Sequence, residues 1–161
     1  MAQYRFITTW RLAHPIDRVY AALRAMDVYP RWWPSFREAK RLNPEVRDVG
    51  EHWEFVVKGK LPYRLRYQIK MTAVEAPRLL AYDALGDLEG GGRTELKEEA
   101  GRVVVTTHWN VQTHGFWLNL LAPLLRWLFA WNHNSVMRRG EKGLTAWLDG
   151  APAVTGQSRM A

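Results

Sequence analysis

The sequence predicts an α+β fold: a curved antiparallel sheet of about six to seven strands wrapped around a long C-terminal helix, with two short helices after the first strand. Apolar and polar residues alternate through most of residues 35–114, as they do in strands with one solvent-facing side. Residues 116–148 instead repeat their apolar positions with the period of a helix. The order of these two patterns along the chain gives the fold class.

Residues 3–12 are expected to form the first strand. The positions that should face the core share one parity: Tyr4, Phe6, Thr8, Trp10 and Leu12. Pro15 then suits the first turn of a short amphipathic helix. The apolar face of that helix consists of Ile16, Val19, Tyr20 and Leu23.

A second short helical segment follows in "DVYPRWWPSF". Asp27 is expected to cap it, and it must end by Trp33 because prolines lie on both sides of the Trp-Trp pair. Adjacent helical residues point about 100° apart, so Trp32 and Trp33 should face different surroundings. We expect Trp33 to point inward together with Phe36.

Several segments between residues 35 and 114 have the pattern of strands. They are "GEHWEFVV", "YRLRYQIKMTAV", "LLAYDALGD", part of "RTELKEEA", and "RVVVTTHWNVQTH". Turn signals are expected at Glu75–Pro77, Gly90–Gly92 and Ala100–Gly101. Such short connections indicate an antiparallel meander. Because a long sheet with one apolar face curls, we expect the C-terminal helix to cover its concave side and to enclose a ligand site there.

The most apolar stretch, "GFWLNLLAPLLRWLFAWNHN", is not a membrane span. Its apolar part, residues 116–131, is shorter than the ~20 residues that a span needs and contains Arg126. Pro123 should separate a leading turn at Trp117–Leu121 from a long helix that begins near Leu124. The inner face of this helix is expected to include Leu124, Leu128, Trp131 and Met137.

In the second half of the helix, the sequence pattern predicts close packing at Gly140 and a tail after Leu148. Gly140 costs about 1 kcal/mol relative to alanine within a helix, so its place on the apolar face indicates close approach to another element. The helix should end near Leu148. Residues 1–150 are expected to form a single ligand-binding domain, and residues 151–161 a flexible C-terminal tail.

Composition excludes several classes of function. The chain has 161 residues and no cysteine, which excludes disulfides, thiolate zinc sites and cysteine nucleophiles. A net charge of +7 favours anionic surfaces, but the basic residues form no long run and accompany no nucleic-acid-binding motif, so we expect no nucleic acid partner. The opening "MAQYRFITTW" has no signal-peptide pattern, and a cytoplasmic location is expected.

Few residues suggest chemistry. The sequence has no HExxH, GxSxG, P-loop or GxGxxG motif, and its histidines lack metal-ligand spacing, so we expect neither a metal nor a cofactor. His108 should face outward on its strand. A buried Tyr67 or Tyr82 could polarise a ligand carbonyl, or could be a packed tyrosine with its hydroxyl satisfied. Asn132 and Asn134 could bond a ligand head group or lie on the helix surface. No catalytic residue is assigned.

Several local motifs resemble the START-like helix-grip superfamily (SRPBCC), and specifically its polyketide cyclase/dehydrase-like branch. In order along residues 3–148 they are "HPIDRVYAAL", "YPRWWPSF", "GEHWEF", "GDLEG", "VVTTHWNV" and "NHNSVMRRGEKGL". The resemblance implies a hydrophobic cavity between the sheet and the C-terminal helix. In that superfamily the cavity holds lipids, polyketides, sterols or other apolar molecules, and some members perform ring closure or dehydration.

The function expected first is binding of a small hydrophobic ligand, such as a lipid or polyketide, in that cavity. The expected lining residues are Trp10, Trp33, Trp53, Phe55, Tyr67, Tyr82, Trp109, Trp127, Trp131 and Met137. One alternative is a polyketide cyclase or dehydratase acting on such a ligand. A second is a lipid carrier that touches anionic membranes through residues 116–131 and the basic residues around them. The chain is expected to be a monomer or a homodimer.

Overall fold

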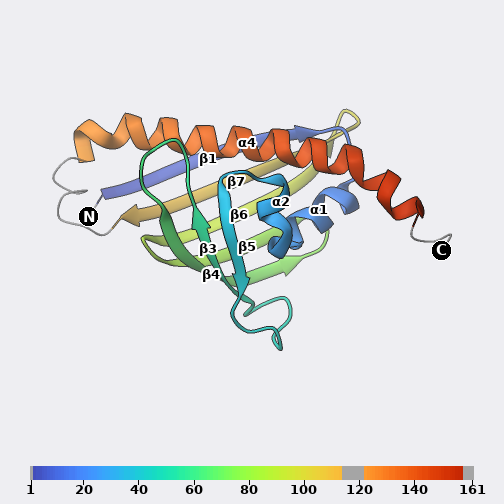
Figure 1. Ribbon diagram of the computed structural model, residues 1–161, viewed down its shortest axis with the longest axis horizontal. Coiled ribbons are helices and arrows are strands. Elements are labelled where there is room, and N and C mark those ends of the chain that lie inside the picture. The colour runs from blue at the N-terminus through green and yellow to red at the C-terminus, as the bar shows by residue number, and fades with distance from the viewer. Residues whose placement is uncertain (1, 114–121, 158–161) are drawn as a thin grey trace.

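The computed structural model describes residues 2–113 and 122–157, which form one antiparallel sheet and a long helix that runs along it (Figure 1). The strands are β1 (Ala2–Leu12), β2 (Phe36–Arg41), β3 (His52–Val57), β4 (Leu65–Glu75), β5 (Leu79–Gly86), β6 (Leu88–Glu99) and β7 (Arg102–Thr113). The helical elements are α1 (Ile16–Arg24), the 3-10 helix η1 (Met26–Val28), α2 (Tyr29–Trp32) and α4 (Ala122–Gln157). The sheet has the order β1-β7-β6-β5-β4-β3-β2, so the predicted fold class is confirmed.

The short helices α1 and α2 close one end of the sheet (Figure 1). The predicted apolar face of α1 is buried, and Pro15 is its N-cap residue. The Tyr29 hydroxyl donates a hydrogen bond to the Leu23 carbonyl oxygen at 2.5 Å and so joins the two helices. The expectation that Asp27 caps the second helix is wrong. Asp27 lies within η1, and α2 begins later with Pro30 in its first turn, where an N–H would have no partner within the helix.

The strand pattern needs two corrections. Gly90–Gly92 do not form a turn, because they lie within β6, and the turn from β5 falls at Gly86, which has a φ of +119°. A glycine is needed inside β6 because a Cβ at Gly92 would overlap the Tyr82 ring. The edge strand β2 is absent from the predicted strands, because it is rich in charged residues and only Phe36 on it is fully buried.

Helix α4 packs closely on α2, as Gly140 predicted. A Cβ at Gly140 would overlap the Trp33 indole, and one at Gly143 would overlap the Trp32 backbone. Helix α4 begins at Ala122, slightly before the expected start near Leu124, so Pro123 lies in its first turn rather than ahead of it. The leading turn predicted at Trp117–Leu121 and the side chain of Leu124 lie outside the described residues.

The helix continues to Gln157 rather than ending near Leu148. Pro152 cannot donate to the Leu148 carbonyl oxygen, four residues earlier, and Arg18 Nη2 donates to that oxygen instead at 2.7 Å. This outside donor satisfies the carbonyl that the proline leaves open, so the helix need not stop there. Among the described helices, none combines the length and the apolar character needed to cross a membrane.

Candidate ligand-binding cavity

A cavity of about 190 Å³ lies between the concave face of the sheet, the α1–α2 end and α4. All seven strands contribute to its lining, because alternate residues of each strand point to the concave side. The described lining residues include no Asp, Glu, Lys or Arg. A cavity of roughly 150 Å³ can hold benzene, whereas sites for drug-sized ligands measure about 300–1,000 Å³. The cavity therefore suits a ligand of one or two rings as it stands.

Aromatic rings form much of the wall. Tyr67 lies 5.9 Å from Phe55 and 5.9 Å from Trp109 between ring centroids. Tyr82 lies 5.4 Å from Trp109, and its hydroxyl end rests over Gly92, where a side chain would displace it. In the register of the sheet Gly92 is opposite both Tyr82 and Trp109. The glycine of β6 thus makes room for two aromatic side chains of its neighbours.

The hydroxyls of Tyr67 and Tyr82 at this wall have no partner in the described part of the protein. Burial raises the pKa of Tyr67 and of Tyr82 well above the usual value, with a further contribution from neighbouring phenols at Tyr82, so both stay neutral. Tyr29 is also buried, but it donates to the Leu23 carbonyl oxygen. Within the described part of the chain the hydroxyls of Tyr67 and Tyr82 have no hydrogen-bond partner. They remain available to a bound molecule.

His133 is a titratable residue of the described lining that the sequence analysis did not single out. Its ring stacks on Phe6 with centroids 4.0 Å apart, and its Nε2 lies 3.4 Å from Thr8 Oγ1. Desolvation by burial lowers its pKa to about 4, so the imidazole is neutral at neutral pH. The sequence did contain a signal for this inward position. His133 lies one helical turn before Met137, which is expected to face inward, and residues four apart share a helix face.

One end of the cavity is closed by the loop between β3 and β4. Asn132 Oδ1 accepts a hydrogen bond from the Lys60 amide at 2.8 Å, and Gly59 packs so closely that a Cβ there would overlap the Asn132 side chain. Tyr63 of the same loop also lines the cavity, and burial raises its pKa to about 12. Asn132 therefore holds the loop on α4, while Asn134 is exposed.

Seven of the ten expected lining residues lie in the cavity wall. They are Trp10, Trp33, Phe55, Tyr67, Tyr82, Trp109 and Met137. Trp33 and Phe36 both face inward, as predicted, while Trp32 is buried outside the lining. His108 lies outside the cavity, over a shallow polar depression on the opposite face of the sheet, in agreement with its predicted outward direction.

The expected wall position is wrong for Trp53, Trp127 and Trp131. Trp53 has the predicted parity but lies beyond the cavity, where its Nε1 donates to Glu51 at 3.3 Å. Trp127 and Trp131 are 65% and 45% exposed. Because a helix turns about 100° per residue, the inner face of α4 belongs to other residues. These are Phe129, Asn132, His133, Val136 and Met137.

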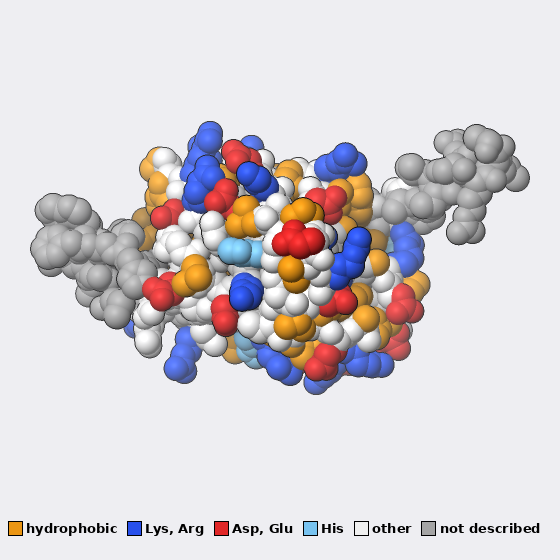
Figure 2. All heavy atoms as spheres, turned by 90° about the horizontal axis from the view of Figure 1, so that it is seen from below, with side chains coloured by type: hydrophobic (Ala, Val, Ile, Leu, Met, Phe, Trp, Pro, Cys, Tyr) orange, Lys and Arg blue, Asp and Glu red, His pale blue; other side chains and the backbone are white. Residues whose placement is uncertain are grey.

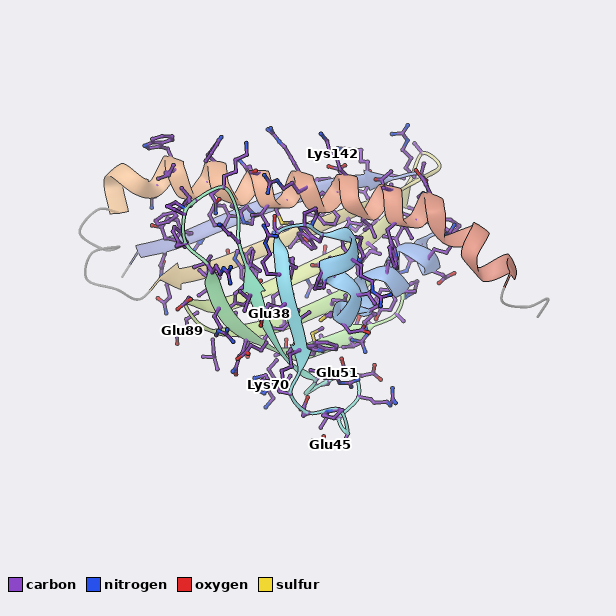
Figure 3. All side chains as sticks on the ribbon, viewed as in Figure 1. Glu38, Glu45, Glu51, Lys70, Glu89 and Lys142 are labelled. Atoms are coloured by element: carbon purple, nitrogen blue, oxygen red, sulfur yellow. The ribbon has the colours of Figure 1, made fainter. Side chains whose placement is uncertain are left out.

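A second buried polar group, Glu51, lies outside the cavity in the loop between β2 and β3 (Figure 3). Its side chain is 4% exposed and accepts from both Nη atoms of Arg24 at 3.0 Å, from the Asp48 amide at 2.9 Å and from Trp53 Nε1. Arg41 Nη2 lies 3.1 Å away. Burial acts to raise the pKa of Glu51, but the bonds from Arg24 and its neighbours outweigh it and lower the pKa to about 2.

The rest of the described surface offers less chemistry. No group of three or more His, Asp or Glu residues within residues 2–113 and 122–157 could hold a metal ion. On the side away from α4, basic and acidic side chains are interspersed with scattered hydrophobic ones (Figure 2). The cavity is therefore the feature of the described chain best suited to a small molecule.

Comparison with known proteins supports the fold. No protein-family model and no curated protein sequence match this chain. Among solved structures, TTHA0849 from Thermus thermophilus matches with a TM-score of 0.70 and 16% identity, covering 89% of this chain and 98% of that one. The Zhui aromatase/cyclase from Streptomyces sp. R1128 matches with a TM-score of 0.68 and 13% identity, covering 93% and 98%.

A further match is the di-domain ARO/CYC StfQ from the steffimycin biosynthetic pathway, with a TM-score of 0.68 and 14% identity. The alignment covers 92% of this chain and 52% of StfQ, so this chain spans about half of that protein. At such low identities these likenesses establish the shared fold.

Proposed function

We propose that this chain binds one small, uncharged, largely aromatic molecule that carries a hydrogen-bonding oxygen. The observation that carries the proposal is the pair of unsatisfied hydroxyls, Tyr67 and Tyr82, in a wall that is otherwise mostly apolar. These hydroxyls face the cavity without a protein partner, and a hydrogen bond from one of them to a ligand oxygen would contribute about 0.5–1.5 kcal/mol. The same wall disfavours a simple hydrocarbon ligand.

The ligand should be uncharged because the described lining offers no ionic partner. A buried ion without a counter-charge costs far more than one unmet hydrogen bond. His133, the one imidazole in the described lining, is neutral at neutral pH because its pKa is about 4. The ligand should also be small, because the cavity of about 190 Å³ is below the usual range for larger ligands.

A polyketide cyclase or dehydratase is the second candidate. Tyr67 and Tyr82 could polarise a carbonyl while His133, which lines the same cavity, accepts a proton from the adjacent carbon. The match to proteins described as aromatase/cyclases favours this candidate. However, a general base works best with a pKa near the working pH, and a pKa of about 4 makes His133 a weak base. Ligand binding without chemistry is therefore proposed first.

Two measurements test the proposal. Mass spectrometry of molecules extracted from the purified protein should find an uncharged aromatic compound that bears a hydroxyl or carbonyl group. Calorimetric titration with 2-naphthol, naphthalene and 2-naphthoate compares one ring system with a hydroxyl, no polar group or a charge. We expect 2-naphthol to bind most tightly and 2-naphthoate least. If 2-naphthoate bound most tightly, or if none of the three bound, the proposal would be contradicted.

The enzymatic candidate has its own test. A linear poly-β-ketone incubated with the protein should cyclise faster than in buffer, and His133→Phe should slow the reaction without abolishing binding of 2-naphthol. Binding without any acceleration would exclude this candidate and leave the binding function in place.

A further inference from the structure

Two tryptophans on the outer face of α4 are exposed. Trp127 is 65% exposed and Trp131 is 45% exposed, and they lie one helical turn apart on the same side. The other described tryptophans are buried or half-buried. The inner side of the same helix segment carries Phe129 and His133, which line the cavity. This part of α4 is therefore apolar on its outer face as well as on the face that packs on the sheet.

Basic side chains surround the two tryptophans. Lys60 Nζ lies 4.9 Å from the centre of the Trp131 ring, and Arg126, which precedes Trp127 in the chain, is exposed. The backbone at Lys60 is anchored to α4, because its amide donates to Asn132 Oδ1. The segments 58–64 and 126–139 contain no Asp or Glu. Trp127, Trp131, Lys60 and Arg126 together are called the tryptophan surface below.

We infer that the tryptophan surface docks on an anionic lipid bilayer. Tryptophan is enriched where an apolar phase meets water, because its indole is apolar with one polar N–H. Basic residues beside it are attracted to anionic headgroups, and each strengthens binding roughly fivefold. A helix with tryptophans and cations on one face lies in the plane of such an interface. Here Trp127, Trp131 and Lys60 share one face, and Arg126 lies at the side of that face.

A second copy of the chain fits this surface less well. A two-fold symmetric interface would place the tryptophan surface against itself and bring the Lys60 and Arg126 cations of both copies together without acidic partners. The outer face of the sheet lacks this character, because charges of both signs are mixed there (Figure 2). Docking also stands apart from the proposed function, since it requires nothing to be bound in the cavity.

Vesicle flotation tests the inference. The full chain is mixed with vesicles of phosphatidylcholine alone or phosphatidylcholine with phosphatidylserine. We expect flotation with the anionic vesicles only, weakened by added salt. Lys60→Gln/Arg126→Gln should reduce the affinity roughly 25-fold, which is roughly fivefold for each cation. Trp127→Ser/Trp131→Ser should reduce it at least tenfold.

A matched control removes exposed apolar side chains from the other face. Ile7→Ser/Leu85→Ser replaces residues that are 71% and 57% exposed and should leave flotation unchanged. Thermal unfolding confirms that each variant is folded, and 2-naphthol binding reports on the cavity separately. Absence of flotation with both vesicles, or equal loss in the control, would overturn the inference. Sedimentation that shows a dimer lost in Trp127→Ser/Trp131→Ser would also overturn it and assign the surface to self-association.

Discussion

Two regions of this molecule bury polar groups in opposite ways. In the loop between β2 and β3, Glu51 receives hydrogen bonds from Arg24, Asp48 and Trp53, so the protein satisfies its own charge. At the cavity wall, Tyr67 and Tyr82 have no partner among the described residues. The difference separates two uses of polarity: the satisfied carboxylate of Glu51 holds the loop between β2 and β3 on α1, and the hydroxyls of Tyr67 and Tyr82 are available to a ligand.

The same contrast appears in protonation. Burial opposes charge at both Glu51 and His133. Close cations and N–H donors outweigh burial at Glu51. They lower its pKa to about 2, so the carboxylate stays ionised until the pH falls to that value. His133 has only Thr8 within hydrogen-bond distance among the described residues, so burial prevails and the imidazole stays neutral. Partners, rather than depth, decide which buried group carries a charge.

The largest expected effect comes from breaking the satisfied cluster. Glu51→Gln removes the carboxylate that pairs Arg24 and Arg41, and loss of one member of a buried ion pair costs about 3–5 kcal/mol. Urea unfolding should show this loss, while the affinity of the folded protein for 2-naphthol stays within about twofold. Glu54→Gln is the control, because its partner Arg66 is 59% exposed and such pairs contribute about 1 kcal/mol or less. Equal losses in the two variants would contradict the account.

The pH dependence of stability should separate the two regions. The folded-state pKa of His133, about 4, is below the usual 6.5, so the unfolded chain binds a proton more readily. Stability should therefore fall as the pH drops from 6.5 to 4, by at most about 3 kcal/mol. The stabilising effect of Glu51 is present above pH 4.5 and is lost as the pH falls toward 2.

Urea unfolding at a series of pH values measures both contributions. His133→Phe should remove the decrease that His133 causes between pH 6.5 and 4 and leave the decrease below 4.5. If His133→Phe leaves the whole pH profile unchanged, His133 is not desolvated as described.

A smaller effect is expected from adding a side chain at Gly92, where the Tyr82 ring packs against β6. Gly92→Ala places a methyl group where the Tyr82 ring lies, and such overpacking costs about 1–3 kcal/mol. Displacement of Tyr82 should also weaken 2-naphthol binding. Gly91→Ala is the adjacent control on the other face of β6, where a Cβ meets the Tyr82 carbonyl oxygen at 3.1 Å, and it should leave binding unchanged. Similar affinities in the two variants would show that Tyr82 does not shape the site.

Much of the fold and of the sheet side of the cavity could be predicted from the sequence. Period-two alternation places Trp10, Phe55, Tyr67 and Trp109 on the concave face, because neighbouring strands share that face. The alternation shows which face of the sheet a residue is on, but it does not show whether that position along the strand lies at the cavity or beyond its end. For that reason it predicts a cavity position for Trp53, although Trp53 packs beside Glu51.

The helix side could be predicted less well. The segment "LLRWLFAWNHN" is apolar nearly all round, so it has no polar face to fix its rotation. The pattern therefore predicts an inward Trp131 and misses His133. The cluster around Glu51 depends on a contact between α1 and a distant loop, and no local pattern encodes such a pairing.

The smallest expected effect is the most direct test of the central claim, that unsatisfied hydroxyls select an oxygen-bearing ligand. Tyr67→Phe/Tyr82→Phe removes both hydroxyls and keeps the rings. Calorimetry with this variant should show 2-naphthol bound about tenfold more weakly, as expected for one lost hydrogen bond, and naphthalene bound at least as tightly as before. Unchanged affinity for 2-naphthol, or an equal loss for both ligands, would contradict the claim.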